Sequence, residues 1–154
     1  MNKPKLIIPF IIAFALYLPF SSAAQDKHKA GKEEGIKWYS FEEAYKLNKK
    51  KPKKMFVDVF TEWCGWCKKM DAETFANPFI AKYMDEHFYC VKLDAERKDT
   101  VEIDGQIFVN PNPASKRSTH KLAVELLRGK MSYPSYVFLK GTSKNQLLIY
   151  TSDC

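Results

Sequence analysis

Cysteine is scarce in this chain, which has four cysteines among 154 residues. A small exported scaffold that depends on disulfides carries a much higher density of cysteine, so this composition argues against that architecture. The chain also lacks internal repeats, and its length suits one domain. Because there are so few cysteines, the position of each one is informative.

The chain also lacks a hydrophobic run as long as a membrane-spanning helix. The longest run, residues 6–20, has 15 residues and is interrupted by two prolines, whereas a span needs about 20. Two lysines precede it and small residues follow it, which predicts a secretory signal peptide over residues 1–24. An uncleaved membrane anchor is the alternative. We therefore expect an exported protein, in a bacterial periplasm or secreted, with no membrane contact beyond an uncleaved signal.

Positive charge is not gathered into one patch. The formal net charge is +7, and two of the lysines leave with the signal, so the mature chain is near +5. The one basic run, residues 49–54, surrounds Pro52 and is typical of a solvated connection between elements. We do not expect an exported protein with scattered lysines to bind nucleic acid.

Residues 25–35 are polar and lack periodicity, which predicts a flexible leader before a folded domain at residues 36–154. The strands expected from the apolar patterns are at 36–39, 54–60, 88–94, 135–140 and 146–151, with a short strand or a hairpin near 107–109. The expected helices are at 41–49, 64–74, 77–86 and 119–128. Their start signals are a Ser40–Glu43 capping box, Asn77 before Pro78, and Ser118. Alternation of strands and helices predicts an α/β domain with helices on the faces of a sheet.

Two cysteines stand two residues apart in the segment Trp63-Cys64-Gly65-Trp66-Cys67, directly after the strand expected at 54–60. Such a pair at a strand-to-helix junction can form and break one disulfide with little backbone movement. Unpaired amides and the helix dipole stabilise a thiolate at a helix N-terminus. We therefore expect Cys64 to be exposed, acidic and nucleophilic, with Cys67 more buried and acting as the resolving thiol.

Asp58 lies inside the apolar strand, six residues before Cys64. Burial should raise the pKa of this carboxyl group, which suits a group that exchanges protons near neutral pH. We expect Asp58 to take the proton that Cys67 loses. The alternative is that Asp58 only accepts hydrogen bonds.

A zinc site is the competing chemistry. Cys64, Cys67, His87 and Cys90 form a C-x2-C…H-x2-C pattern with a spacing close to that of zinc sites. Cys90, however, lies in an apolar strand where a small buried residue fits, so we expect an inert thiol there. A Cys90–Cys154 disulfide is a further alternative. We expect no metal and no organic cofactor.

The segment 56–68 resembles the active-site segment of the thioredoxin family, since the aspartate, the tryptophan before the first cysteine, the glycine and the final lysine match in place. Residues 132–139 resemble that family's loop and strand with a cis-proline facing the cysteines. The resemblance covers about residues 36–151. Together with the predicted signal peptide, it makes the chain similar to the exported thioredoxin-like proteins of bacteria. It implies a thioredoxin fold with a mixed sheet of four to five strands and helices on both faces.

The same resemblance implies a thiol–disulfide oxidoreductase whose partners are proteins. These would be substrates with cysteines and a redox partner that supplies or accepts electrons. Pro134 would be cis, and the backbone of Tyr133 would pair with a bound substrate as an added strand. The residues expected to contact the substrate are Trp63, Gly65, Trp66, Tyr133 and Pro134.

The chain departs from the thioredoxin pattern in three places. Trp66 replaces the proline or histidine that is common between the cysteines. The segment 95–129 is longer than in a minimal thioredoxin, and the usual closing helix is not expected after the last strand. We favour the reducing direction, because residues 58–68 look most like thioredoxin. A disulfide oxidase or isomerase and a redox-inert binding module stay as alternatives.

Overall fold

The computed structural model describes residues 35–141 and 147–151. The predicted signal peptide at 1–24, nearly all of the predicted leader, and Cys154 lie outside the described residues. Within the described ranges, no helix combines the length and the apolar character that crossing a membrane requires.

A five-stranded mixed sheet forms the centre of the domain, with the strand order β1-β3-β2-β6-β7. Its strands are β1 (Trp38–Tyr39), β2 (Lys54–Phe60), β3 (Phe88–Asp94), β6 (Ser135–Gly141) and β7 (Leu147–Thr151). β1 and β2 run parallel to β3, whereas β6 is antiparallel to β2 and to β7. The central position that two apolar faces predicted for β2 is confirmed.

Two of the helices begin at the residues that the sequence signals predicted. Ser40 and Glu43 form the capping box of α1 (Phe41–Lys50). The side chain of Asn77 accepts hydrogen bonds from two amides in the first turn of α3 (Pro78–His87), whose first residue is proline. The helix expected at 64–74 is instead α2 (Gly65–Met70) followed by the π-helical turn η1 (Asp71–Phe75).

The segment between β3 and β6 contains the hairpin that the sequence left as an alternative to a single strand near 107–109, and a helix that starts later than expected. A two-stranded hairpin, β4 (Val101–Ile103) and β5 (Gln106–Phe108), turns at two residues with positive φ, Asp104 and Gly105. The following helix α4 (Lys121–Leu126) begins two residues later than predicted. Its cap is His120 rather than Ser118, because the imidazole Nδ1 accepts the Leu122 amide at 3.2 Å.

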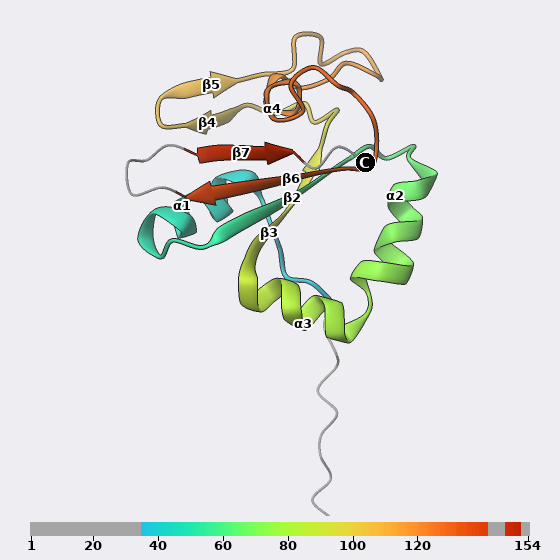
Figure 1. Cartoon of the computed structure of the whole chain (residues 1–154). Coiled ribbons are helices and arrows are strands. Elements are labelled where there is room, and N and C mark those ends of the chain that lie inside the picture. Colours follow the sequence, from blue (N-terminus) through green and yellow to red (C-terminus); the bar gives the residue numbers. More distant parts are fainter. Residues whose placement is uncertain (1–34, 142–146, 152–154) are drawn as a thin grey trace, which may run out of the picture. The chain divides into compact units, whose positions relative to one another are not determined.

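The sheet separates two hydrophobic cores. Figure 1 shows α4 and the β4–β5 hairpin on one side of the sheet and α3 on the other. The first core joins α1, α4 and the hairpin to the odd-numbered positions of β2, such as Val57. The second core joins η1 and α3 to the even-numbered positions, such as Phe56. Helices therefore cover both faces of the sheet, as the fold class predicted.

Phe56 is the centre of the second core, since its ring lies within 6.4 Å of five other aromatic rings. We expect Phe56→Ala to lower the free energy of unfolding by about 3–5 kcal/mol, because it removes a buried ring and leaves a cavity. Denaturant unfolding followed by circular dichroism measures this change.

Phe79 on α3 offers the matched control, because the same substitution removes a ring that is 86% exposed. Phe79→Ala should change the free energy of unfolding by no more than about 0.5 kcal/mol. Equal losses for the two variants would contradict this assignment of the core.

Candidate active site

The Cys64–Cys67 pair forms a disulfide at the start of α2, as predicted. Cys64 is the N-cap residue, and its Sγ accepts a hydrogen bond of 3.1 Å from the Cys67 backbone amide. The Cα atoms of the two cysteines are 5.3 Å apart. An amide of the first helical turn is therefore already directed at the sulfur on which a thiolate would form.

The prediction that Cys64 is exposed is wrong for this disulfide-bonded state. Cys64 is 5% exposed and Cys67 is 2% exposed, so only the expected order of burial is confirmed. The disulfide and the Cys67 amide hold the Cys64 sulfur against the first turn of α2. The exposed groups are the flanking indoles, Trp63 at 51% and Trp66 at 67%.

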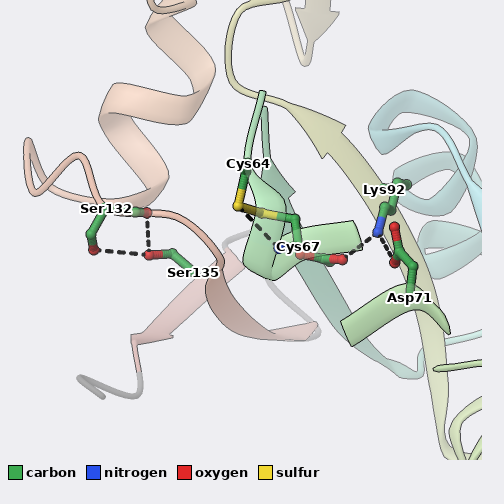
Figure 2. Close-up of a disulfide and its surroundings, with 7 residues drawn as sticks. Cys64, Cys67, Asp71, Lys92, Ser132 and Ser135 are labelled. Atoms are coloured by element: carbon green, nitrogen blue, oxygen red, sulfur yellow. Dashed lines mark hydrogen bonds and ion pairs between the residues drawn. A yellow bond between two sulfur atoms is a disulfide. The ribbon is translucent and has the colours of Figure 1, made fainter. Parts of the chain in front are cut away.

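The loop before β6 contains the predicted cis peptide bond, between Tyr133 and Pro134. The hydroxyl of Ser135 donates to the backbone carbonyl of Ser132 at 2.7 Å and so closes the loop on itself. Figure 2 shows this loop on one side of the disulfide and the Asp71–Lys92 pair on the other. The Tyr133 ring also meets the Trp63 ring edge-on, with centroids 6.0 Å apart, which joins the loop to the cysteine motif.

Trp63 is held from the side of the segment 95–120 as well. Its Nε1 donates to a Glu96 carboxylate oxygen at 3.0 Å, and the Arg117 guanidinium lies 4.8 Å from the centre of its ring. Trp63 and Arg117 are among the residues that line a cavity of about 760 Å³. The long segment between β3 and β6 thus reaches the residue that precedes Cys64.

Packing does not require glycine at position 65. A Cβ atom built at this position would meet no atom within 4 Å. Its place between the cysteines leaves the N-terminal turn of α2 open on that side.

Asp58 of β2 is paired with Lys92, its parallel neighbour on β3. The Lys92 ammonium donates to Asp58 Oδ2 at 2.6 Å, and the Asp58 side chain is only 2% exposed. Burial raises the pKa of the Asp58 carboxyl above its usual range, Lys92 opposes this shift, and the charge of Asp71 adds to it. The predicted direction of the pKa shift is confirmed.

Lys92 is a member of the site that reasoning from the sequence missed. Its ammonium also pairs with Asp71, the first residue of η1, whose backbone amide donates to the Cys67 carbonyl. The rings of Trp38 and Phe60 have their centroids 5.0 Å from Lys92 Nζ. A lysine inside an apolar strand is the sequence signal that could have identified it.

The other oxygen of Asp58, Oδ1, is buried and has no hydrogen-bond partner among the described residues. A buried carboxylate oxygen with no partner is costly in its charged form, so this atom is a ready proton acceptor. Asp58 thus has the burial and the free oxygen that a buried base needs, together with one cation that limits its basicity.

The four residues of the possible zinc site are not brought together. In the described ranges, no three His, Cys, Asp or Glu side chains form a group that could hold a metal ion. His87 is exposed at the end of α3, with its ring stacked on Tyr83. Cys90 is a free, fully buried thiol, and burial raises its pKa to about 12, which fits the inert role that the sequence predicted.

Comparison with known proteins identifies a family whose model matches most of this chain. The family model described as "Thioredox_DsbH: Protein of unknown function, DUF255" matches residues 25–147. Spermatogenesis-associated protein 20 of Mus musculus is 35% identical over 68 residues, which are 44% of this chain and 9% of the mouse protein. An uncharacterized protein of Archaeoglobus fulgidus is 33% identical over 63 residues, 41% of this chain and 50% of that protein. The matches thus span half or less of these relatives.

Two solved structures share the architecture. A thioredoxin from Thermus thermophilus aligns with a TM-score of 0.53 over 75% of this chain and 72% of that chain, at 16% identity. A structure described as "DsbH Oxidoreductase" aligns with a TM-score of 0.50 over 77% of this chain and 74% of that chain, at 17% identity. At these identities the likeness shows the fold, so the predicted thioredoxin fold is confirmed.

The raised pKa of Asp58 makes the stability of the disulfide form depend on pH. Because the folded state binds this proton more tightly than the unfolded state, the contribution is fully present below the unfolded pKa. It is lost as pH rises through the higher folded pKa. Asp58→Asn should remove this pH-dependent loss of stability. The free energy of unfolding of the variant minus that of the wild type should therefore rise with pH, by at most about 1.4 kcal/mol per pH unit.

Denaturant titrations at a series of pH values, from about pH 4 to about pH 8, measure this difference. Glu73→Gln is the control, because it neutralises an exposed carboxylate on η1 and should follow the wild-type curve. A difference between Asp58→Asn and wild type that stays constant with pH would contradict the assignment.

Proposed function

This chain belongs to the Thioredox_DsbH family, and on that premise we propose that it is a thiol–disulfide oxidoreductase that reduces disulfides in exported proteins. The observation that carries the proposal is the Cys64–Cys67 disulfide at the start of α2, with the Cys67 amide on the Cys64 sulfur. The chemistry of these groups supports the proposed activity.

The proposed reaction transfers two electrons from the dithiol to the substrate. In the reduced protein, the Cys64 thiolate attacks one sulfur of a substrate disulfide. A bond forms between Cys64 and that sulfur, and the other substrate sulfur leaves as a thiolate and takes up a proton. The Cys67 sulfur then attacks Cys64 Sγ, which forms the intramolecular disulfide and releases the second substrate thiolate.

Asp58 is the proposed acceptor of the Cys67 proton. A base of this kind must be basic enough near neutral pH, and burial gives the Asp58 carboxyl the required upward shift of its pKa. Lys92 stabilises the charged form that accepts the proton, at 2.6 Å from Oδ2. The free oxygen Oδ1 is the atom that would bind the proton.

We assign substrate contact to the surface around the disulfide. Trp63 and Trp66 present large exposed rings beside the buried sulfurs, and such rings are common anchors at protein interfaces. Tyr133 and Pro134 directly precede β6, where an extended substrate segment could pair with the backbone as an added strand. Gly65 leaves room for that segment over the first turn of α2.

The proposed location and partners rest on the sequence. The pattern of residues 1–24 favours export, to a periplasm or beyond the cell. A reductase in that location needs a second protein that returns two electrons to the Cys64–Cys67 disulfide after each cycle. Substrates would be proteins that carry disulfides.

Trapping the mixed disulfide tests the reaction and the roles of the two cysteines. Reduced Cys67→Ser should accumulate a covalent complex with a disulfide-bonded test peptide, because Cys64 still attacks but nothing resolves the product. Cys64→Ser should form no complex, and both variants should lose turnover. Mass spectrometry without reductant identifies the adduct, and a fluorogenic peptide disulfide measures turnover.

Cys90→Ala is the control. The Cys90 thiol is free and buried and is not part of the cysteine motif, so this substitution should leave turnover at the wild-type level. Binding of the peptide without any adduct in Cys67→Ser would contradict the proposal and favour a redox-inert binding module. Wild-type protein that oxidises dithiol peptides faster than it reduces disulfides would reverse the proposed direction.

A further inference from the structure

Three charged side chains connect the buried interior of the site to solvent. The side chain of Asp58 is 2% exposed, that of Lys92 is 20% exposed and that of Asp71 is 42% exposed. The Lys92 ammonium contacts a carboxylate oxygen of each aspartate, and Figure 2 marks its contact with Asp71. One cation is thus shared between a buried carboxylate and a half-exposed one.

We propose that Asp71 is a positioning residue of the thiol–disulfide reaction, which shares the Lys92 ammonium with Asp58 and so keeps Asp58 basic enough to accept the Cys67 proton. The inference rests on the proposed function and adds a residue that the cysteine motif does not contain. Asp71 lies one helical turn after Cys67, so the same helical segment carries the resolving thiol and the group that tunes its base.

The charges of the three groups set the basicity of Asp58. A lysine ammonium that contacts one carboxylate can take the position most favourable to that group, whereas an ammonium held between two carboxylates must satisfy both contacts. Asp71 also repels a negative charge on Asp58 directly. Both effects destabilise the charged form of Asp58 relative to the protonated form, so both make Asp58 a stronger base. Removing the charge of Asp71 should therefore make Asp58 release its proton at lower pH.

The surroundings of Lys92 favour contact of its ammonium with both carboxylates. Its ammonium lies among the rings of Trp38, Phe60 and Phe75, with centroids 5.0, 5.0 and 5.7 Å away, which confine it between the two carboxylates. Lys92 and Asp71 both line a cavity of about 440 Å³ on this side of the sheet. Protons and water can reach the half-exposed end of the triad there while Asp58 stays buried.

The elements packed around Asp58 each bring one charged or titratable group to its surroundings. Lys92 comes from β3 and Asp71 from η1. Tyr136 is the register partner of Asp58 on β6, and Cys67 lies on α2, which leads into η1. In the disulfide form Cys67 does not titrate, so Asp58, Lys92, Asp71 and Tyr136 are the charged or titratable groups that remain around the site.

The direct test is a titration of the Asp58 carboxyl in the full chain with its disulfide intact. The carboxyl carbon is followed by ¹³C NMR and assigned by its loss in Asp58→Asn. Asp71→Asn should move the midpoint to lower pH by about half a unit or more. Asp71→Glu, which keeps the charge, should restore the midpoint toward the wild-type value. Glu73→Gln, on the same turn but directed at Lys69, should leave it unchanged.

Turnover gives the second readout. The low-pH limb of kcat/KM should move to lower pH in Asp71→Asn and return in Asp71→Glu, while thermal unfolding at one pH stays close to wild type. An Asp58 midpoint that does not move in Asp71→Asn, or that moves equally in Glu73→Gln, overturns the inference. Absence of turnover in the wild-type protein would instead overturn the proposed function, and the titration distinguishes the two failures.

Discussion

The ion pair between Asp58 and Lys92 is the interaction on which the rest of the site depends. A carboxylate that is 2% exposed in the middle of a sheet is costly unless a cation and hydrogen bonds accompany it, and losing the partner of such a pair costs about 3–5 kcal/mol. The parallel register of β2 and β3 sets the two side chains next to each other. Lys92 also contacts Asp71, which directly follows the helix that carries Cys67.

The outer side of the site is organised by a second residue, Trp63. Three separate parts of the chain hold its ring: Tyr133 of the cis-proline loop, Glu96 after β3, and Arg117 before α4. The segment after β3 is tied to the centre of the fold as well, since the Ala95 amide donates to the Phe60 carbonyl at 2.8 Å. In the proposed function, the buried ion pair serves the chemistry, while the held indole shapes the surface beside the proposed nucleophile.

The parts of the structure that the sequence predicted are those whose signals are local. The capping box at Ser40, the Asn77–Pro78 helix start and the doubly apolar strand β2 each depend on a few neighbouring residues. The cysteine pair was found in the same way, whereas the cis-proline was implied by the resemblance to the thioredoxin family. The fold class followed from the alternation of these elements and from the resemblance carried by two motifs.

Two features that the sequence did not predict share the opposite property, because the residues that cause them are far apart in the sequence. Lys92 meets Asp58 across 34 residues, and no local pattern states that pairing. His120 displaces Ser118 as the cap of α4 because its ring is buried and bonded to the Asp99 carbonyl, 21 residues away. The burial of Cys64 in the disulfide form comes from its contacts with the first turn of α2, which its place before a helix does not specify.

The function proposed for this chain requires Cys64–Cys67 to be a reversible redox couple rather than a structural disulfide. Equilibration of the protein with defined dithiol and disulfide buffers, followed by quantification of the free thiols, measures its reduction potential. We predict a reversible two-electron couple near the reducing end of the oxidoreductase range, at about −270 mV. A pair that does not equilibrate, or a potential below about −300 mV as structural disulfides have, would contradict the proposed function.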